Sequence, residues 1–483
     1  MIDANIKDEE LHRLSTAQKA LKVNLDANRY GTFAEIGAGQ EVVRWFFKVG
    51  AAAGTISKSM SAYDMTVSDA IYGHCKRYVS RDRLQNMLDY EYALNLERLS
   101  PSRGDGTAFF AFADTVAARN FQGTNECHGW MGIKYQPYPR DDHSQIIIHV
   151  RMLDHENAHQ QQVLGIIGVN LIYAAFFLDH KPHLIVESLL DSLTTARLEI
   201  DMIEFSGIAF RHVDNRVMSL KLVQLGLSGA AMFGPSGEVL QPSEILHKRS
   251  ILVERGSFRP VTKVNIDMIQ CARKHFLAEP EVKPDQVIEL MEITMRNLLV
   301  DGKIDLSDFL ARADVLAAVG KTVLISDYFE YYRLAAYLTR YTSEPIALTM
   351  GLPSLQDLFQ EKYYVELEGG ILEAFGRLFT KDLRIYVYPS INKISRQLNT
   401  VDNVEMSENI RHLYRYMVDR ARIKQLTNFD ESILDIFSRD VLQRIKDQNT
   451  SWENMVPPEV AEVIKRRRFF GYKESFSESQ HLI

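Results

Sequence analysis

Short apolar runs that alternate with helical patterns constrain the fold of this chain more than any other feature of its sequence. From residue 108 onward, runs rich in Ile, Val and Phe are separated by segments with helical periodicity. We expect strands at 108–113, 130–135, 145–151, 198–205, 230–233, 250–255, 287–293, 322–326, 345–350 and 383–388. The intervening helices are expected at 156–178, 214–225, 264–277, 307–319, 328–341 and 371–379. This alternation is typical of βαβ units and of a largely parallel sheet.

The predicted fold class is therefore α/β, with one or two open, doubly wound sheets and helical additions at both ends. A (β/α)₈ barrel is the alternative, because about eight of the strands could be parallel. The uneven lengths and spacings of the helices favour open sheets. Residues 130–151 depart from the alternation, since the loop PYPRDD between two strands predicts an antiparallel hairpin.

The chain has 483 residues, which is enough for two or three domains. We predict a helical N-terminal region at 1–106 and a first α/β domain at 107–249. A second, Rossmann-like α/β domain is expected at 250–390, followed by a helical C-terminal region at 391–483.

Composition indicates a cytoplasmic protein without membrane or nucleic-acid partners. The net charge of −7 lacks the basic excess of a nucleic-acid binder, and the three cysteines are scattered without a CxxC pair. The N-terminus MIDANIKDEELHRL is polar and acidic, unlike a signal or transit peptide. The most apolar stretch, 163–178, is short for a membrane span and is expected to be a core helix.

The segment 251–272, ILVERGSFRPVTKVNIDMIQCA, is the most informative candidate for a binding site. It is predicted to be a strand, a Gly-Ser turn and a helix, which can place backbone N–H groups and a helix N-terminus against phosphate. The residues predicted to bind a small phosphorylated ligand there are Arg255, Gly256, Ser257, Arg259, Lys263 and Asn265. The alternative is a purely structural strand–turn–helix.

This segment resembles the first signature of the nucleotidyltransferase superfamily, G-[ST]-F-x-P-x-T-x-G-H, found in phosphopantetheine and nicotinate-mononucleotide adenylyltransferases. The matching positions are Gly256, Ser257, Phe258, Pro260, Thr262 and Asp267. Val264 replaces the family's glycine and Asn265 its final histidine. The resemblance implies ATP or another nucleotide, with Mg²⁺, as the cofactor, and it covers about 14 residues of the chain.

The whole chain also resembles a bacterial family whose members carry two conflicting labels, TonB-dependent receptor and nicotinate-nucleotide adenylyltransferase. The segments that carry this resemblance are YGTFAEIGAGQE, MSAYDM, VDNRVMSL and RGSFRPVTKVN. A receptor barrel requires many alternating strands about ten residues long, which this sequence lacks. The receptor label is therefore excluded.

Polar residues at the ends of predicted strands are candidates for chemistry, because ligands of parallel α/β folds bind at the carboxyl ends of strands. Glu292 and Asp327 are the predicted general acid/base or metal-binding carboxylates. Arg151 and Glu204 also stand in apolar strands. Arg151 and Glu292 could instead be a purely structural pair, since charges in apolar strands need partners when buried.

Three further motifs have structural alternatives. The glycines of EIGAGQE, residues 35–41, could form a phosphate-binding nest or only a tight turn before a helix. His128 in ECHGWMG has ligand-type neighbours, although successive strand residues point to opposite faces. His155 and His159 in HENAH match the letters of a zinc-protease motif, but a third ligand is not evident.

The sequence therefore supports two hypotheses about function. The first is an enzyme that binds a nucleotide or a phosphorylated metabolite in an α/β crevice, and the resemblance implies a transferase related to the nucleotidyltransferases. The second is a non-catalytic assembly protein that forms homo-oligomers through its helical ends and the small-residue segment 50–54.

Overall fold

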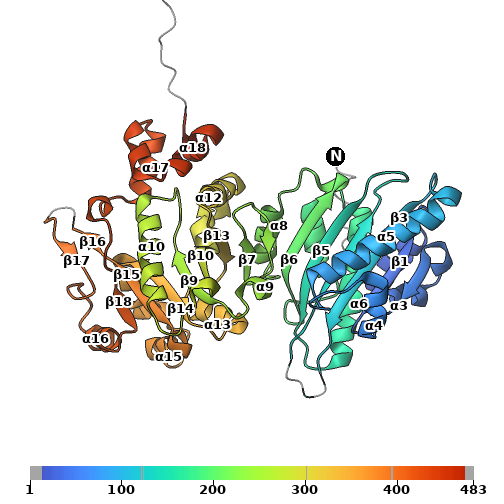
Figure 1. Cartoon of the computed structure of the whole chain (residues 1–483), viewed down its shortest axis with the longest axis horizontal. Helices are drawn as coiled ribbons and strands as arrows, with labels where there is room; N and C mark the ends of the chain where they lie inside the picture. The colour runs from blue at the N-terminus through green and yellow to red at the C-terminus, as the bar shows by residue number, and fades with distance from the viewer. Residues whose placement is uncertain (1–13, 121, 123–124, 301, 393–394, 474–483) are drawn as a thin grey trace, which may run out of the picture. The chain divides into compact units, whose positions relative to one another are not determined.

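The computed structural model describes residues 14–120, 122, 125–300, 302–392 and 395–473. The chain forms two compact units, one up to Ser228 and the other from Gly229 onward (Figure 1). Each unit is built around its own sheet and its own apolar core. The structure thus groups the four predicted regions into two bodies.

The first unit contains a mixed sheet of six strands in the order β2-β1-β3-β4-β5-β6. Its strands are β1 (Arg29–Ile36), β2 (Ile56–Met60), β3 (Ala108–Ala117), β4 (Cys127–Tyr135), β5 (Ser144–Met152) and β6 (Leu198–Gly207). Strands β2, β1 and β3 are parallel, whereas β3 to β6 form an antiparallel meander. The antiparallel hairpin predicted at 130–151 is β4 and β5.

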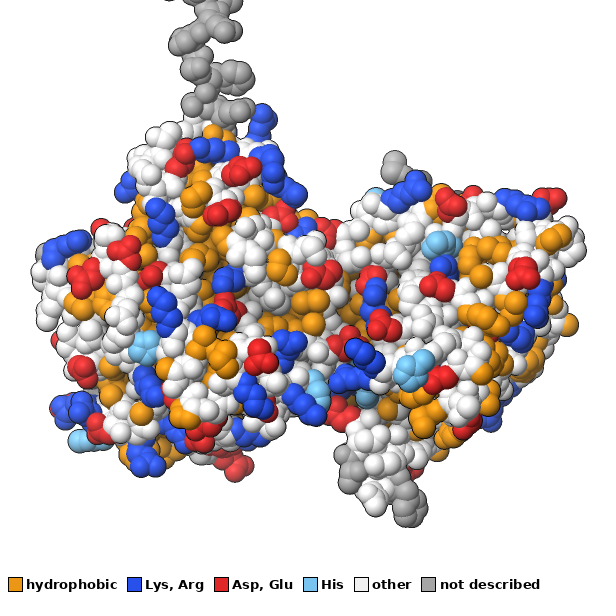
Figure 2. All heavy atoms as spheres, in the orientation of Figure 1, with side chains coloured by type: hydrophobic (Ala, Val, Ile, Leu, Met, Phe, Trp, Pro, Cys, Tyr) orange, Lys and Arg blue, Asp and Glu red, His pale blue; other side chains and the backbone are white. Residues whose placement is uncertain are grey.

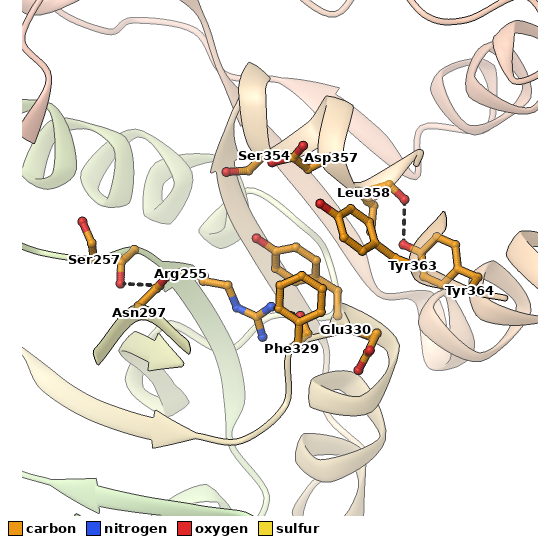
Figure 3. A pocket seen from close by; sticks show the side chains of 12 residues that line it. Arg255, Ser257, Asn297, Phe329, Glu330, Ser354, Asp357, Leu358, Tyr363 and Tyr364 are labelled. Carbon is orange, nitrogen blue, oxygen red and sulfur yellow. Dashed lines mark hydrogen bonds between the residues drawn. The ribbon is translucent and has the colours of Figure 1, made fainter. Parts of the chain in front are cut away.

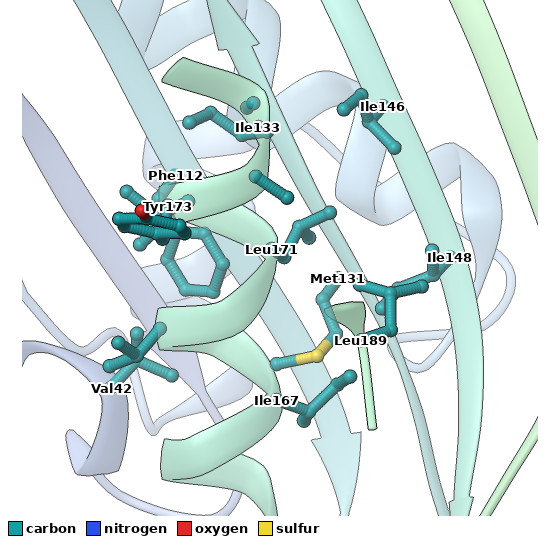
Figure 4. Close-up of a cluster of buried hydrophobic side chains, with 14 of the residues drawn as sticks. Val42, Phe112, Met131, Ile133, Ile146, Ile148, Ile167, Leu171, Tyr173 and Leu189 are labelled. Carbon is teal, nitrogen blue, oxygen red and sulfur yellow. The ribbon is translucent and has the colours of Figure 1, made fainter. Parts of the chain in front are cut away.

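The main apolar core of the first unit is built around one long helix. The helices are α2 (Thr16–Asn24), α3 (Glu41–Val49), α4 (Met65–Tyr72), α5 (Arg81–Arg103), α6 (Asn157–Phe177), α7 (Pro182–Ser188) and α8 (Asn215–Gln224). Figure 4 shows Ile167 and Leu171 of α6 against Met131 of β4 and Ile148 of β5. By length and hydropathy α6 could cross a membrane, but 83% of its apolar window is buried inside the protein. It is the core helix predicted at 156–178, while α5 packs on β3 and β4.

The second unit contains a sheet of eight strands in the order β18-β15-β14-β9-β10-β13-β7-β8. Its strands are β7 (Ala230–Phe233), β8 (Val239–Leu240), β9 (Ser250–Arg255), β10 (Val287–Thr294), β13 (Thr322–Ser326), β14 (Ile346–Gly351), β15 (Arg384–Tyr388) and β18 (Ile423–Gln425). The six strands from β18 to β13 are parallel, and β7 and β8 extend one edge antiparallel. Numbered along the chain, the parallel strands have the order 3-2-1-4-5-6 of Rossmann-type folds.

Helices cover both faces of this sheet, as a doubly wound fold requires. The helices are α9 (Pro242–Leu246), α10 (Lys263–Leu277), α11 (Met295–Leu298), α12 (Leu306–Ala318), α13 (Tyr331–Tyr341), α14 (Leu352–Leu358), α15 (Gly370–Leu378), α16 (Arg411–Asp419), α17 (Ser438–Lys446) and α18 (Pro458–Arg467). Helices α13 to α16 share one core with Val253 and Leu348. On the other face, α10 packs against β9 and β14. Two short hairpins, β11–β12 (Leu299–Val300, Lys303–Ile304) and β16–β17 (Ser390–Ile391, Leu398–Asn399), complete the unit.

The predicted α/β, doubly wound class is confirmed, and both sheets are open in the described part of the chain. Each of the ten predicted strands overlaps an observed one. The division into regions differs in three places. Residues 391–483, expected to be helical, also contain β18, which pairs with β15 in the second sheet. Residues 1–106 contain β1 and β2 besides helices, and β7 and β8 pair into the second sheet although they precede residue 250. Residues 1–13 and 474–483 of the predicted terminal regions lie outside the described part.

Lys, Arg, Asp and Glu side chains are intermixed on the face of the molecule shown in Figure 2. This face has no broad surface of one sign, in agreement with the modest net charge of −7. The absence of nucleic-acid and membrane partners remains a prediction.

Two glycines in the turn between β1 and α3 allow a test of how closely this turn approaches β3. Gly37 and Gly39 both have positive φ, at 107° and 94°, but only Gly37 is crowded. A Cβ on Gly37 would lie 1.9 Å from the carbonyl oxygen of Val116, whereas a Cβ on Gly39 would meet nothing within 4 Å. We expect Gly39→Ala to lower the free energy of unfolding by about 1–3 kcal/mol through backbone strain alone. Gly37→Ala should lower it by more, because β3 must also move.

Urea unfolding followed by the fluorescence of Trp45 and Trp130, both in the first unit, measures the difference. Equal losses of stability for the two variants would contradict the close approach of Gly37 to β3.

Candidate functional site

The strand order of the second unit defines where a ligand can bind. Strand order reverses between β9 and β14, so the connections that follow these two strands leave toward opposite faces of the sheet. In open α/β sheets the crevice at this switch point, outside the carboxyl ends of the strands, is the usual binding site. A cavity of about 310 Å³ lies there. It is lined by Arg255, Gly256, Ser257, Asn297, Phe329, Glu330, Tyr331, Ser354, Asp357, Leu358, Tyr363 and Tyr364 (Figure 3).

A buried ion pair forms one wall of this switch-point cavity. Arg255, the last residue of β9, donates from Nε and Nη2 to the two carboxylate oxygens of Glu292 on β10, at 2.8 and 2.9 Å. The hydroxyl of Ser326, at the end of β13, donates to the same carboxylate at 2.6 Å. Glu292 has no exposed surface, so the pair joins the ends of three adjacent strands.

Arg255 also fixes the turn that follows β13. Its guanidinium donates to the carbonyl oxygens of Tyr328 at 2.7 Å and Phe329 at 2.5 Å, and it lies 4.1 Å from the ring centre of Tyr331. Burial alone would lower the pKa of Arg255, but the charge and hydrogen bonds of Glu292, together with Tyr331 and Glu330, raise it. Arg255 is therefore a permanent cation whose charge is balanced within the protein.

Another part of the cavity wall is aromatic. The rings of Phe329 and Tyr363 meet edge to face with centroids 5.2 Å apart, and the guanidinium of Arg296 stacks on Phe329 at 3.7 Å. Tyr364 donates its hydroxyl to the carbonyl of Leu358 at 2.6 Å, drawn as a dashed line in Figure 3. These contacts hold the rings in place before any ligand binds.

The turn after β9 is held from several sides. The N–H of Gly256 donates to the carbonyl of Glu292 at 3.0 Å, and Arg312 donates to the carbonyl of Ser257 at 3.3 Å. Phe258 and Val261 are buried, so this turn fills with side chains the space that a glycine-rich loop leaves open for pyrophosphate. The hydroxyl and N–H of Ser257 have no hydrogen-bond partner among the described residues.

The start of α10 is closed by an internal capping box. Thr262 accepts from the N–H of Asn265 at 3.4 Å, and the Asn265 side chain accepts from the N–H of Thr262 at 3.0 Å. The amide nitrogen of Asn265 donates in turn to Glu254 at 2.8 Å. Asn265 therefore caps the helix and holds a buried carboxyl, and it does not line the switch-point cavity.

The structure places the eight residues predicted for the site in different parts of the second unit. Arg255, Gly256 and Ser257 line the switch-point cavity, and Glu292 lies beneath it. Arg259 pairs with Asp308 at 2.6 Å and lines a different cavity. Lys263 and Asn265 lie on the first turn of α10, and Asp327 is exposed outside the cavity. Their predicted roles in binding and catalysis remain predictions.

Sequence reasoning missed most of the cavity wall. Phe329, Tyr331 and Tyr363 come from two connections that are separated along the chain and meet only in the fold. The cluster of Tyr and Phe between 328 and 332 was the available signal, because aromatic side chains at the start of a helix after a strand are candidates for ligand contact.

In the EIGAGQE motif of the first unit, the side chain of Glu35 takes the position at the start of α3 that a bound anion would have. Glu35 accepts from the N–H groups of Val42 and Val43 at 2.9 Å each, which satisfies the N-terminus of α3 where an anion would bind. Burial raises the pKa of Glu35 to about 7, and the neighbouring Asp114 adds a second buried carboxyl. The structure thus favours the tight-turn interpretation.

The two histidine motifs of the first unit do not form metal sites among the described residues. His128 lies 3.1 Å from His149, whose other ring nitrogen lies 2.6 Å from Asp201, and burial lowers the pKa of His128 to about 4. Helix α6 begins at Asn157, so His155 precedes it and the HENAH residues do not share a helix. The described residues contain no group of three or more His, Cys, Asp or Glu side chains placed to hold a metal.

Comparison with known proteins finds only weak structural likenesses over part of the chain. No protein-family model matches the chain, and neither does any curated protein. Among solved structures, the competence/damage-inducible protein CihA from Agrobacterium tumefaciens is 15% identical with a TM-score of 0.25, covering 33% of this chain and 94% of its own. A CinA superfamily protein from Enterobacter cloacae is 14% identical with a TM-score of 0.24, covering 34% and 92%. These likenesses carry no functional inference for this chain.

Glu254 gives the second unit a specific pH dependence. Burial is the main cause that raises its pKa from 4.5 to about 8, although the hydrogen bond from Asn265 opposes the shift. The folded state therefore binds the proton more tightly than the unfolded state. This contribution to stability is complete below about pH 4.5 and is lost as the pH rises to about 8. The loss should be about 2–5 kcal/mol.

Glu254→Gln should remove this slope, because glutamine keeps the acceptor for Asn265 and cannot ionise. The measurement is urea unfolding from pH 5 to pH 9, followed by Trp452 fluorescence with Trp45 and Trp130 replaced by Phe. Parallel pH profiles for the parent and the Gln variant would contradict this account of Glu254.

Proposed function

We propose that the second unit binds a nucleotide in the switch-point cavity. The observation that carries the proposal is the coincidence of three features at one place: the 3-2-1-4-5-6 strand order, a cavity at its switch point, and an aromatic wall on which the guanidinium of Arg296 stacks. Nucleotides are the ligands that combine a flat aromatic ring with a charged group.

The volume of the cavity favours a mononucleotide. About 310 Å³ is at the small end of the range for small-molecule pockets, and the turn after β9 is filled by Phe258 and Val261. A dinucleotide would require a glycine-rich approach to its pyrophosphate, and an acidic residue free at the end of the second strand. Glu292 stands at the end of that strand but is occupied by Arg255 and Ser326.

Each part of a mononucleotide has a matching group in the cavity. The base would stack against Phe329 and Tyr363, because aromatic rings stack with any base. The phosphate would accept from the hydroxyl and N–H of Ser257 and from Arg296, whose guanidinium stacks on Phe329 of the cavity wall. Asp357, which lines the cavity and is exposed, would accept from ribose hydroxyls or hold an accompanying Mg²⁺.

Nucleotidyl transfer would require catalytic residues at the site in addition to nucleotide binding. The motif residues Thr262 and Asn265 cap α10, and Arg259 is directed to a different cavity. These placements favour a nucleotide-binding role over the transferase activity implied by the resemblance. A cytoplasmic location and a homo-oligomeric state remain predictions beside this proposal.

Titration calorimetry with AMP, ATP with and without Mg²⁺, NAD and coenzyme A tests the proposal. Tyr363→Ala should weaken binding of the preferred nucleotide about tenfold or more, because loss of one stacking ring costs about 1–3 kcal/mol. Tyr416→Ala is the matched control, since Tyr416 is 59% exposed on α16 and does not line the cavity. The control should bind as the parent does.

Failure of every nucleotide to bind at millimolar concentration would overturn the proposal. Unchanged affinity of Tyr363→Ala would show that the nucleotide binds elsewhere and would overturn it equally.

A further inference from the structure

A second cavity of the second unit, which we call the basic cavity, lies on the other side of the turn after β9. It encloses about 430 Å³ between that turn, the start of α12, the end of α17 and the segment that follows α18. Four cations line it, Arg259, Lys446, Arg467 and Arg468, together with two carboxylates, Asp305 and Asp308. The cations therefore exceed the carboxylates by two.

Both carboxylates of the basic cavity already have partners. Asp308 accepts from Arg259 at 2.6 Å and from Arg312 at 2.7 Å, and it is 8% exposed. Asp305 is the N-cap of α12 and accepts from the N–H groups of Ser307 and Asp308 at 2.8 and 3.2 Å. Neither acid forms an ion pair with Lys446 or Arg467.

Two cations of the basic cavity, Lys446 and Arg467, keep donors that no described residue accepts. Lys446 is exposed and forms no ion pair or hydrogen bond with any described residue. Arg467 donates through a single nitrogen to Asp314 at 2.6 Å, which leaves its other N–H groups available. Arg468 ends α18 in the left-handed conformation, with φ of 55°, and the chain turns there to form the cavity wall at Phe469 and Phe470.

Charge and size together indicate the class of ligand. Cations that converge on one cavity repel each other, and an anion placed among them removes that repulsion. Phosphate oxygens accept charge-assisted hydrogen bonds from Arg and Lys, at about 1.5–3 kcal/mol each. A cavity of about 430 Å³ is larger than a single inorganic anion requires.

We propose that the basic cavity is a binding site for a small polyanion that carries at least two phosphate groups. This site is separate from the switch-point cavity, and the proposal does not rest on nucleotide binding there. The two cavities share a chain of contacts, because Arg259 and Arg312 both bind Asp308 and Arg312 also donates to the carbonyl of Ser257. A polyanion that contacts Arg259 would therefore act on the same turn that lines the switch-point cavity.

Calorimetric titration of the full chain with sodium tripolyphosphate tests the site. Lys446→Glu should weaken binding at least tenfold, because it replaces an unpaired cation of the cavity by an anion. Lys274→Glu makes the same charge change at an exposed position on the last turn of α10 and should alter affinity less than twofold. Tyr363→Ala, in the switch-point cavity, should leave tripolyphosphate binding unchanged.

Lys446→Ala is a milder change that separates loss of binding from loss of folding. It should weaken binding severalfold, while its thermal unfolding midpoint stays at the parent value. The proposal is overturned if tripolyphosphate does not bind at 0.15 M salt, if Lys446→Glu and Lys274→Glu weaken binding equally, or if Tyr363→Ala abolishes it.

Discussion

The ion pair between Arg255 and Glu292 is the interaction on which the candidate site depends. It joins β9 to β10 below the cavity, and Ser326 of β13 donates a hydrogen bond to the same carboxylate. Arg255 also binds the carbonyl of Phe329 and stacks on Tyr331, both in the turn after β13. Removing one partner of a buried pair leaves an uncompensated charge at a cost of about 3–5 kcal/mol. Because Glu292 balances the charge of Arg255, the pair adds no net charge to the cavity, part of whose wall is aromatic.

The sequence predicted the elements of the second unit better than their relationships. Alternating apolar runs located its parallel strands, apart from the three-residue β18. In the first unit, β1 was missed because RYGTFAEI contains a glycine and small residues. Gly31 is needed there, since a Cβ would lie 2.1 Å from the carbonyl oxygen of Phe110. Strand order depends on pairing between distant segments, which local patterns do not encode.

The same limit applies to the site. The sequence identified the turn after β9, and three of the residues selected there, Arg255, Gly256 and Ser257, line the cavity. It could not separate them from Arg259 and Asn265, because the roles of these two are set by Asp308 and Glu254, which lie elsewhere in the fold. A charged residue in a motif can bind a ligand or a neighbour, and only the tertiary contacts decide between them.

Hydrogen exchange of the full chain with and without saturating AMP tests the central claim most directly, because it locates binding without altering any residue. The account predicts slower exchange in the turns that line the switch-point cavity, at 256–258, 328–331 and 354–364, and unchanged exchange in the first unit. Protection confined to the turn between β1 and α3, or protection nowhere in the chain, would contradict it.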